Sequence, residues 1–238
     1  MSEHHSFTFL THIPGLDHAP LHVLHGVFVA VLLIVLMAVA RFQLSFAMKK
    51  AEGALVPSSK VTYRNIFEII AEKIYGLCET TMGAHDAKIY FPFIGTLFVF
   101  IFTCNVVGLI PGFGAATDNL NTTLALGIFV FIYYNVMGIK VNGVVGHIKH
   151  FMGPIWWLAP FMFFIEIVSH LIRPISLAFR LKWNMTGDHI VLGVFSSLVP
   201  YFLPIVFMML GLFVALVQAF VFSLMTMVYI SMSTAHDH

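Results

Sequence analysis

The sequence has very little charge. Only 10% of its 238 residues are Asp, Glu, Lys or Arg, whereas a soluble domain usually has about 25%. Hydrophobic residues make up 59% of the chain. A soluble surface cannot be built from such a composition, so we expect a lipid bilayer to be the solvent. The formal net charge is only +1, which excludes the basic field that nucleic-acid binding requires.

Cysteines are scarce, and a basic N-terminal region is missing. Cys78 and Cys104 are the only cysteines, and they form no CxxC motif. Neither a disulfide framework nor a metal site is therefore expected, and no cofactor motif is present. No Lys or Arg precedes the first apolar run, so the chain lacks the basic region of a cleaved signal. We expect the first helix to be retained.

Long apolar runs predict an all-α membrane protein, with about five membrane helices plus an interfacial amphipathic helix. The expected spans cover roughly 25–40, 90–110, 122–139, 154–183 and 190–232. About 20 apolar residues cross a bilayer, so the last two stretches are over-length and must tilt or kink. Pro174 and Pro204 are available kink sites because proline removes a helix hydrogen bond.

The segment 62–83 has a different pattern. Ile66, Ile70, Ile74 and Leu77 recur at helical spacing, and charged residues lie mostly on the other faces. The segment is too charged to span. It fits an interfacial helix on the cytoplasmic surface and equally a surface helix packed on its neighbours.

Basic residues predict the orientation of the chain. Four follow the first span and two follow the third: Arg41, Lys49, Lys50, Lys60, Lys140 and Lys149. The positive-inside rule then places the N-terminus outside and the C-terminus in the cytoplasm. The expected single membrane domain, 1–238, comprises an external tail (1–20), the first span with its cytoplasmic loop (21–60), the interfacial helix (61–85), the second and third spans (88–150), a tilted helix hairpin (153–233) and a cytoplasmic tail (234–238).

Polar side chains gather on one face of the helix expected at 154–183. Glu166, Arg173 and Arg180 are spaced seven residues apart, so each drifts only about 20° from the last. The same stripe contains Ser169, His170, Ser176 and Asn184. A charge at the bilayer centre costs at least about 2.5–3.5 kcal/mol, so such residues usually face protein, a partner or water.

Simpler roles remain open for several of these residues. Long basic side chains near a helix end can reach the headgroups, which would account for Arg173 and, better still, for Lys182 beside Trp183. Glu166 could be the buried partner of Arg173 or of His170. In the last helix Gln218 is expected to face the charged helix, and a plain interhelical hydrogen bond would satisfy it.

Three stretches, "RPISLAFRLKWNMTGDH", "FVALVQAFVFSLMTMVYISM" and "NVVGLIPG", resemble subunit a of the rotary ATP synthase membrane sector. The most specific match is the ordered set Pro174, Ser176, Leu177, Arg180, Leu181 and Asn184, followed by Gln218. The resemblance implies a proton-translocating stator in a bacterial plasma (inner) membrane, without catalysis or a cofactor of its own. The implied partners are the c-ring subunits, the subunit b peripheral stalk and the rest of the ATP synthase complex. The last two helices would form a strongly tilted hairpin facing the rotor ring.

The resemblance also implies roles for single residues. Arg180 falls on the family's essential arginine, which separates two half-channels. Asn184 and Gln218 fall on polar positions near it, Glu166 on a channel position, and Asn105 on an asparagine of the second span.

The chain departs from the family pattern at two places. Asp188 stands where a small residue is usual, with His189 after it, and Gly211 replaces the His or Glu of some members. We therefore expect Asp188 and His189 to supply the ionisable inlet group.

Two other membrane functions are alternatives to a stator subunit. A stand-alone ion-coupled transporter usually shows paired halves, and none is visible. A haem-bearing redox subunit needs histidines inside spanning helices, and His170 is the clear case among 13 histidines.

Overall fold

The computed structural model describes residues 21–49, 63–110, 113–152, 159–198 and 203–234, and these are helical apart from short connections. The elements are α1 (Leu21–Lys49), α2 (Tyr63–Met82), α3 (Ala84–Gly108), the short helix η2 (Ala116–Asp118), α4 (Leu120–Met152), α5 (Ala159–Leu198) and α6 (Leu203–Thr234). This confirms the all-α prediction. The predicted external tail, residues 50–60 of the predicted cytoplasmic loop and residues 235–238 lie outside the described part.

Helices α3, α4, α5 and α6 are long and apolar enough to cross a membrane. Helix α1 has a shorter apolar stretch, Val23–Val39. Together they account for the five membrane helices that the sequence predicts. Helix α2 is the more polar helix that precedes α3.

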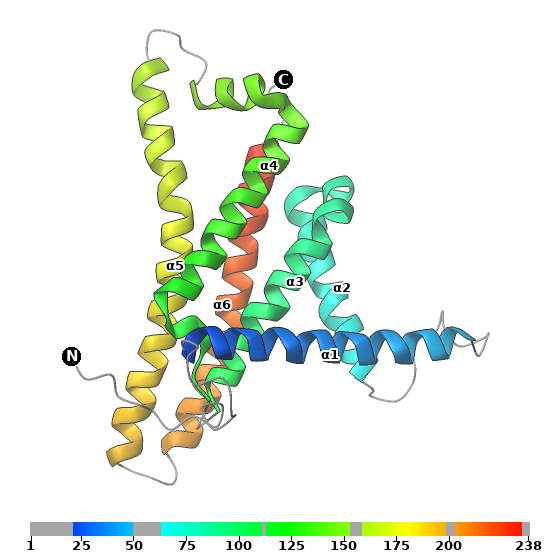
Figure 1. Cartoon of the computed structure of the whole chain (residues 1–238), viewed down its shortest axis with the longest axis vertical. Helices are drawn as coiled ribbons and strands as arrows, with labels where there is room; N and C mark the ends of the chain where they lie inside the picture. The colour runs from blue at the N-terminus through cyan, green and yellow to red at the C-terminus, as the bar shows by residue number, and fades with distance from the viewer. Residues whose placement is uncertain (1–20, 50–62, 111–112, 153–158, 199–202, 235–238) are drawn as a thin grey trace.

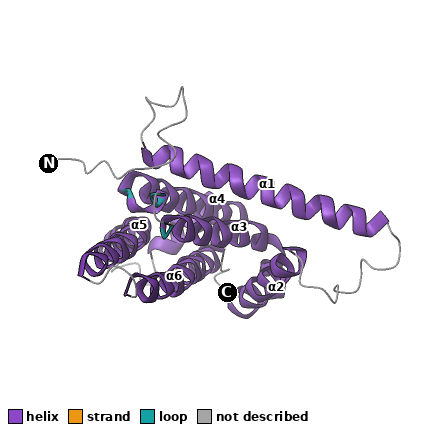
Figure 2. Cartoon of the chain, turned by 90° about the horizontal axis from the view of Figure 1, so that it is seen from below, coloured by secondary structure: helices purple, strands orange, loops and turns teal. Residues whose placement is uncertain are grey.

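The helices follow two directions. Helices α3 to α6 run broadly together, and α1 runs across them (Figure 1). Seen from below, α1 lies along the side formed by α3 and α4, whereas α5 and α6 lie on the opposite side (Figure 2). Helix α1 and helices α3 to α6 therefore cannot all be parallel to the normal of one bilayer.

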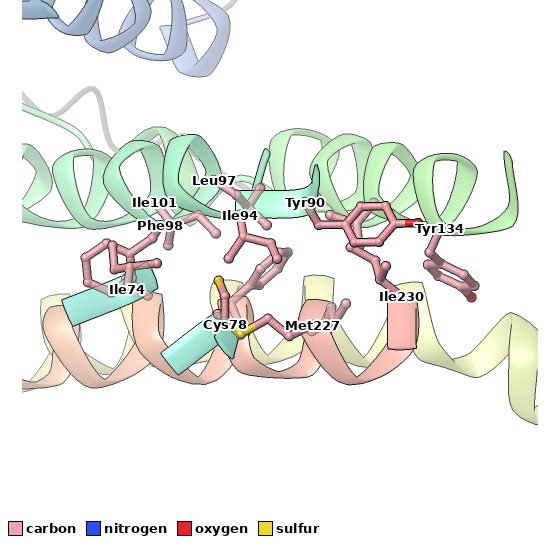
Figure 3. Close-up of a cluster of buried hydrophobic side chains, with 14 of the residues drawn as sticks. Ile74, Cys78, Tyr90, Ile94, Leu97, Phe98, Ile101, Tyr134, Met227 and Ile230 are labelled. Atoms are coloured by element: carbon pink, nitrogen blue, oxygen red, sulfur yellow. The ribbon is translucent and has the colours of Figure 1, made fainter. Parts of the chain in front are cut away.

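A buried apolar cluster joins α2, α3, α4, α5 and α6 (Figure 3). Ile94 and Ile101 of α3 and Phe222 of α6 have no exposed surface. Helix α2 adds Ile74 and Cys78 to the cluster. Helix α2 is therefore packed on its neighbours, as one of the two sequence interpretations proposed, and its place at a bilayer surface stays a prediction.

Helix α5 extends further than the sequence analysis predicted. The predicted end near 183 is wrong, because α5 continues to Leu198 and the polar residues 184–189 are helical. Gly187 disfavours a helix there most strongly, and a glycine costs a helix about 1 kcal/mol, which packing overrides. Pro174 does lie inside α5. Pro204 is the second residue of α6, where the first turn tolerates proline, so it introduces no internal kink.

Helix α4 also replaces an expected loop. The chain is helical from Leu120 to Met152 apart from Gly143, whose φ of 72° and ψ of 166° interrupt the helix. Glycine reaches this left-handed region without the strain that a Cβ would cause. The helix therefore changes direction at Gly143 and continues past the expected end of the third span at 139.

Candidate functional site

Arg180 lies near the middle of α5 with its side chain half-buried. Leu177 and Leu181, on the same helix, are almost fully buried, whereas Phe179 is 41% exposed. Within the part of the chain that the structure describes, no ion pair or hydrogen bond engages the Arg180 side chain. The helix thus carries a fixed positive charge that the described residues do not neutralise.

An amide pair lies one turn further along α5. The Nδ2 group of Asn184 donates a hydrogen bond to Oε1 of Gln218 on α6. Gln218 is only 4% exposed, and its Nε2 atom has no hydrogen-bond partner among the described residues. The prediction that Gln218 faces the polar helix is confirmed, and the interhelical hydrogen bond is present.

Asp188 and His189 follow on the next turn of α5, and both are half-buried. Asp188 is four residues beyond Asn184 and eight beyond Arg180, so the three side chains leave the helix within a sector of about 80°. The Nε2 atom of His189 is buried without a hydrogen-bond partner in the described part of the chain.

Before Arg180, the polar stripe of α5 contains an ion pair. Nη2 of Arg173 lies 3.0 Å from Oε1 of Glu166, and the Arg173 guanidinium carbon lies 5.3 Å from the ring centre of Tyr229 on α6. Glu166 therefore pairs with Arg173, one of the two partners that the sequence allowed. These two charges neutralise each other, whereas no described residue neutralises the charge of Arg180.

His170 faces α4. Its Nε2 atom lies 2.8 Å from Oδ1 of Asn135, and its ring makes edge contacts with Phe131 and Tyr134. In the same stripe Ser169 is half-buried and Ser176 is exposed. The predicted stripe is therefore a real feature of α5, and it contacts both α4 and α6.

Asn105 lies apart from this stripe. Its Oδ1 accepts a 2.8 Å hydrogen bond from the buried hydroxyl of Thr117 in η2. The neighbouring residue Asp118 accepts a 2.6 Å hydrogen bond from the hydroxyl of Thr186 on α5. Sequence reasoning missed the Thr186 contact, because its partner is 68 positions away and no periodic pattern connects them.

The geometry suits the transfer of ions or protons better than the making and breaking of covalent bonds. Across the described ranges, no three His, Cys, Asp or Glu side chains are placed to hold one metal ion. Titratable and amide groups instead lie on both sides of one unneutralised arginine along an apolar helix. Groups of this kind inside a membrane typically mark an ion or proton path.

The family model described as "ATP synthase A chain" matches residues 27–231. The chain belongs to this family. It is 47% identical over 233 residues to a protein named "ATP synthase subunit a" from Bdellovibrio bacteriovorus, covering 98% of this chain and 100% of that protein. "ATP synthase subunit a 3" of Pelobacter propionicus is 42% identical over 238 residues, with 98% and 99% covered.

A third member of the ATP synthase A chain family, "ATP synthase subunit a" of Geobacter sulfurreducens, is 47% identical over 175 residues, covering 74% of this chain and 76% of that protein. The resemblance found in the sequence is thereby confirmed. Family membership also argues against both alternatives, the stand-alone transporter and the haem-bearing subunit.

Proposed function

We propose that this chain is the proton-translocating stator subunit of a rotary ATP synthase. In this proposal Arg180 faces the carboxylates of a rotating ring of small subunits, and ATP chemistry takes place on other subunits. The observation that carries the proposal is the charge of Arg180, which has no partner among the described residues although it lies in an apolar helix. A charge inside a membrane needs a counter-charge, and a ring carboxylate would provide it.

The chemistry requires a guanidinium at this point. A carboxyl group that faces lipid stays protonated because desolvation raises its pKa. Beside a guanidinium the ionised form is favoured, so the carboxyl group releases its proton. A guanidinium keeps its own charge even in a poor dielectric, whereas an ammonium can lose it. Arg180 would therefore discharge each arriving carboxylate and prevent direct passage of protons between two half-channels.

The polar residues on either side of Arg180 fit two half-channels. One group comprises Glu166, Ser169, His170, Arg173 and Ser176, and the other comprises Asn184, Asp188, His189 and Gln218. A histidine exchanges a proton near neutral pH, and amide groups can order water. The charge on Arg180 between the groups would force each proton to travel with the ring.

Helix lengths support a strongly tilted hairpin. Helix α5 has 40 residues, about 60 Å at 1.5 Å per residue, whereas the hydrocarbon core is about 30 Å thick. An α5 confined to the bilayer would therefore lie roughly 60° from its normal. The crossing direction of α1 fits this geometry, since α1 could then follow the normal (Figure 1).

The remaining features of the proposal follow from the basic residues and the family. The N-terminus would face outside and the C-terminus the cytoplasm of a bacterial plasma membrane. The partners would be the c-ring, the subunit b peripheral stalk and the rest of the complex.

Site-specific photo-crosslinking tests the rotor-facing surface. Phe179 of α5 and Phe213 of α6 are 41% and 62% exposed, and Phe42 of α1, 74% exposed, is the matched control. Each would be replaced by benzoylphenylalanine in the assembled membrane complex. Products with the small ring subunit are expected from positions 179 and 213 but not from position 42. Equal ring products from all three positions, or none from 179 and 213, would refute the proposed surface.

A further inference from the structure

The short helix η2 joins an exposed position of the molecule to α5. Asp118 of η2 is exposed, and its Oδ1 accepts a 2.6 Å hydrogen bond from the hydroxyl of Thr186. This is a direct contact between an exposed carboxylate and a hydroxyl group on the helix that carries Arg180. It lies on the Asp188 side of Arg180, because Thr186 is only two residues before Asp188.

Two further hydrogen bonds hold η2 in place. The backbone N–H of Gly114 donates to Nε2 of His25 on α1 at 3.1 Å, and His25 is only 2% exposed. On the other side of η2, Thr117 donates to Asn105 of α3. Helices α1, α3, α4 and α5 all contact η2, so the Asp118 carboxylate has a fixed position at the end of this loop.

An acceptor for a proton lies one turn beyond Thr186. His189 is three residues further along α5, and side chains at this spacing have Cβ atoms about 5–6 Å apart on one helix face. One water molecule can bridge such a separation. The buried Nε2 atom of His189 has no partner among the described residues, so it remains available for that hydrogen bond.

Gly211 of α6, seven residues before Gln218, offers no titratable group. Gly211 is buried, and a Cβ at Gly211 would come within 2.7 Å of Cδ2 of Leu109. The side chain of Leu109 therefore fills the space beside Gly211. Gly211 and Leu109 thus offer only hydrocarbon, whereas Thr186 and His189 of α5 offer a hydroxyl and an imidazole.

We propose that Asp118 is the entry carboxylate of the half-channel on this side and that Thr186 relays its proton to His189. Protonated Asp118 would donate to Oγ1 of Thr186 while the Thr186 hydroxyl proton passes, through a bridging water, to Nε2 of His189. Asp118 then takes a new proton from water, and His189 passes its proton on toward the ring. The inference rests on the proposed stator function and adds two residues, Asp118 and Thr186, to its proton path.

Paired substitutions separate proton transfer from mere attachment of η2 to α5. Asp118→Asn keeps an oxygen that accepts the Thr186 hydrogen bond but removes the group that carries a proton. Asp118→Glu keeps a carboxylate, Thr186→Ser keeps a hydroxyl, and Thr186→Val removes the hydroxyl at nearly the same shape. Each would be measured as ATP-driven acidification of inverted vesicles, with the amount of assembled complex determined by immunoblot.

The relay predicts at least a tenfold loss of acidification per assembled complex for Asp118→Asn and for Thr186→Val. Asp118→Glu and Thr186→Ser should keep most of it. Full pumping by Asp118→Asn would overturn the proposal, because the hydrogen bond would then be only structural. If Asp118→Asn fails to assemble, the two Thr186 variants provide the test. Equal acidification rates for Thr186→Ser and Thr186→Val would then overturn the relay.

Two additional arms complete the experiment. Arg180→Ala in the same vesicles separates a failure of the relay from a failure of the stator function. If Arg180→Ala abolishes acidification while Asp118→Asn acidifies at the wild-type rate, only the relay is refuted. If Arg180→Ala acidifies at the wild-type rate, the stator function itself is refuted. Asp118→Cys should react with a membrane-impermeant thiosulfonate from the external side. Background labelling is expected to be low because Cys78 and Cys104 have no exposed surface, and an unreactive Cys at position 118 would contradict an aqueous entry.

Discussion

A close approach between α4 and α5 gives a prediction that involves no charged residue. A Cβ added to Gly127 of α4 would lie 2.6 Å from the carbonyl oxygen of Pro174 and 3.4 Å from its carbonyl carbon. Non-bonded carbon contacts are ordinary from about 3.5 Å, so α5 would have to withdraw by roughly 1 Å. The obstructing atom belongs to the backbone, and no change of rotamer can move it away.

Two opposing effects on stability can be compared for Gly127→Ala. Alanine favours a helix over glycine by about 1 kcal/mol, whereas overpacking a close contact costs about 1–3 kcal/mol. The cost of the close contact therefore equals or exceeds the gain in helix propensity, and α5 is displaced near Pro174. Arg180 is six residues further, about 9 Å along the helix at 1.5 Å per residue. A misplacement of about 1 Å can cost about 100-fold where groups must meet in a set geometry.

We therefore expect Gly127→Ala to reduce ATP-driven acidification at least about tenfold per assembled complex, and Gly127→Val to reduce it further. The control is Gly146→Ala, also in α4, where the added Cβ would meet only Cβ of Asn142 at an ordinary 3.5 Å. Acidification by Gly127→Ala at the rate of Gly146→Ala, with equal assembly, would refute the claim that this crossing positions Arg180.

Three further predictions concern other contacts. Burial raises the pKa of the Cys78 thiol to about 11, so a maleimide at pH 7.5 should modify Cys78 only after denaturation in detergent, and labelling of the native complex would contradict the packing of α2. Exchanging the ion pair, Glu166→Arg with Arg173→Glu, should restore assembly, measured by immunoblot, above the level of either single variant, because a single change places like charges together; a swapped variant that assembles no better than the single variants would contradict the claim that these two residues act through their ion pair. Gln218→Leu leaves the Asn184 amide without its partner on α6 and should lower acidification several-fold at normal assembly, so an unchanged rate would assign that hydrogen bond a packing role only.

Hydropathy and helical spacing predicted most of the fold. The apolar runs predicted the membrane helices because no soluble arrangement could bury them. Seven-residue spacing likewise predicted that Glu166, Arg173 and Arg180 share a face, and the structure pairs the first two. These features depend on local composition and on the geometry of one helix, which a sequence contains directly.

Helix ends and contacts between distant segments were harder to predict. The apolar stretches predict a span that ends near 183 and another that begins near 190, yet α5 continues through the polar residues 184–189, because polar residues can serve a site within a helix as well as a loop. The contacts of His25 with Gly114 and of Asp118 with Thr186 join positions 89 and 68 residues apart. Such pairs arise from the packing of whole helices, and no local pattern in the sequence specifies them.

The central claim is that Arg180 is the charge that each ring carboxylate meets. The most direct test is ATP-driven acidification of inverted membrane vesicles that carry Arg180→Ala, with assembly checked by immunoblot. Lys182→Ala is the matched control, since the Lys182 ammonium lies 5.5 Å from the ring centre of the exposed Trp183 and is expected only to anchor the helix. Abolished acidification in an assembled Arg180→Ala complex, with Lys182→Ala near the wild-type rate, is the predicted result. An Arg180→Ala complex that acidifies vesicles at the wild-type rate would contradict the account.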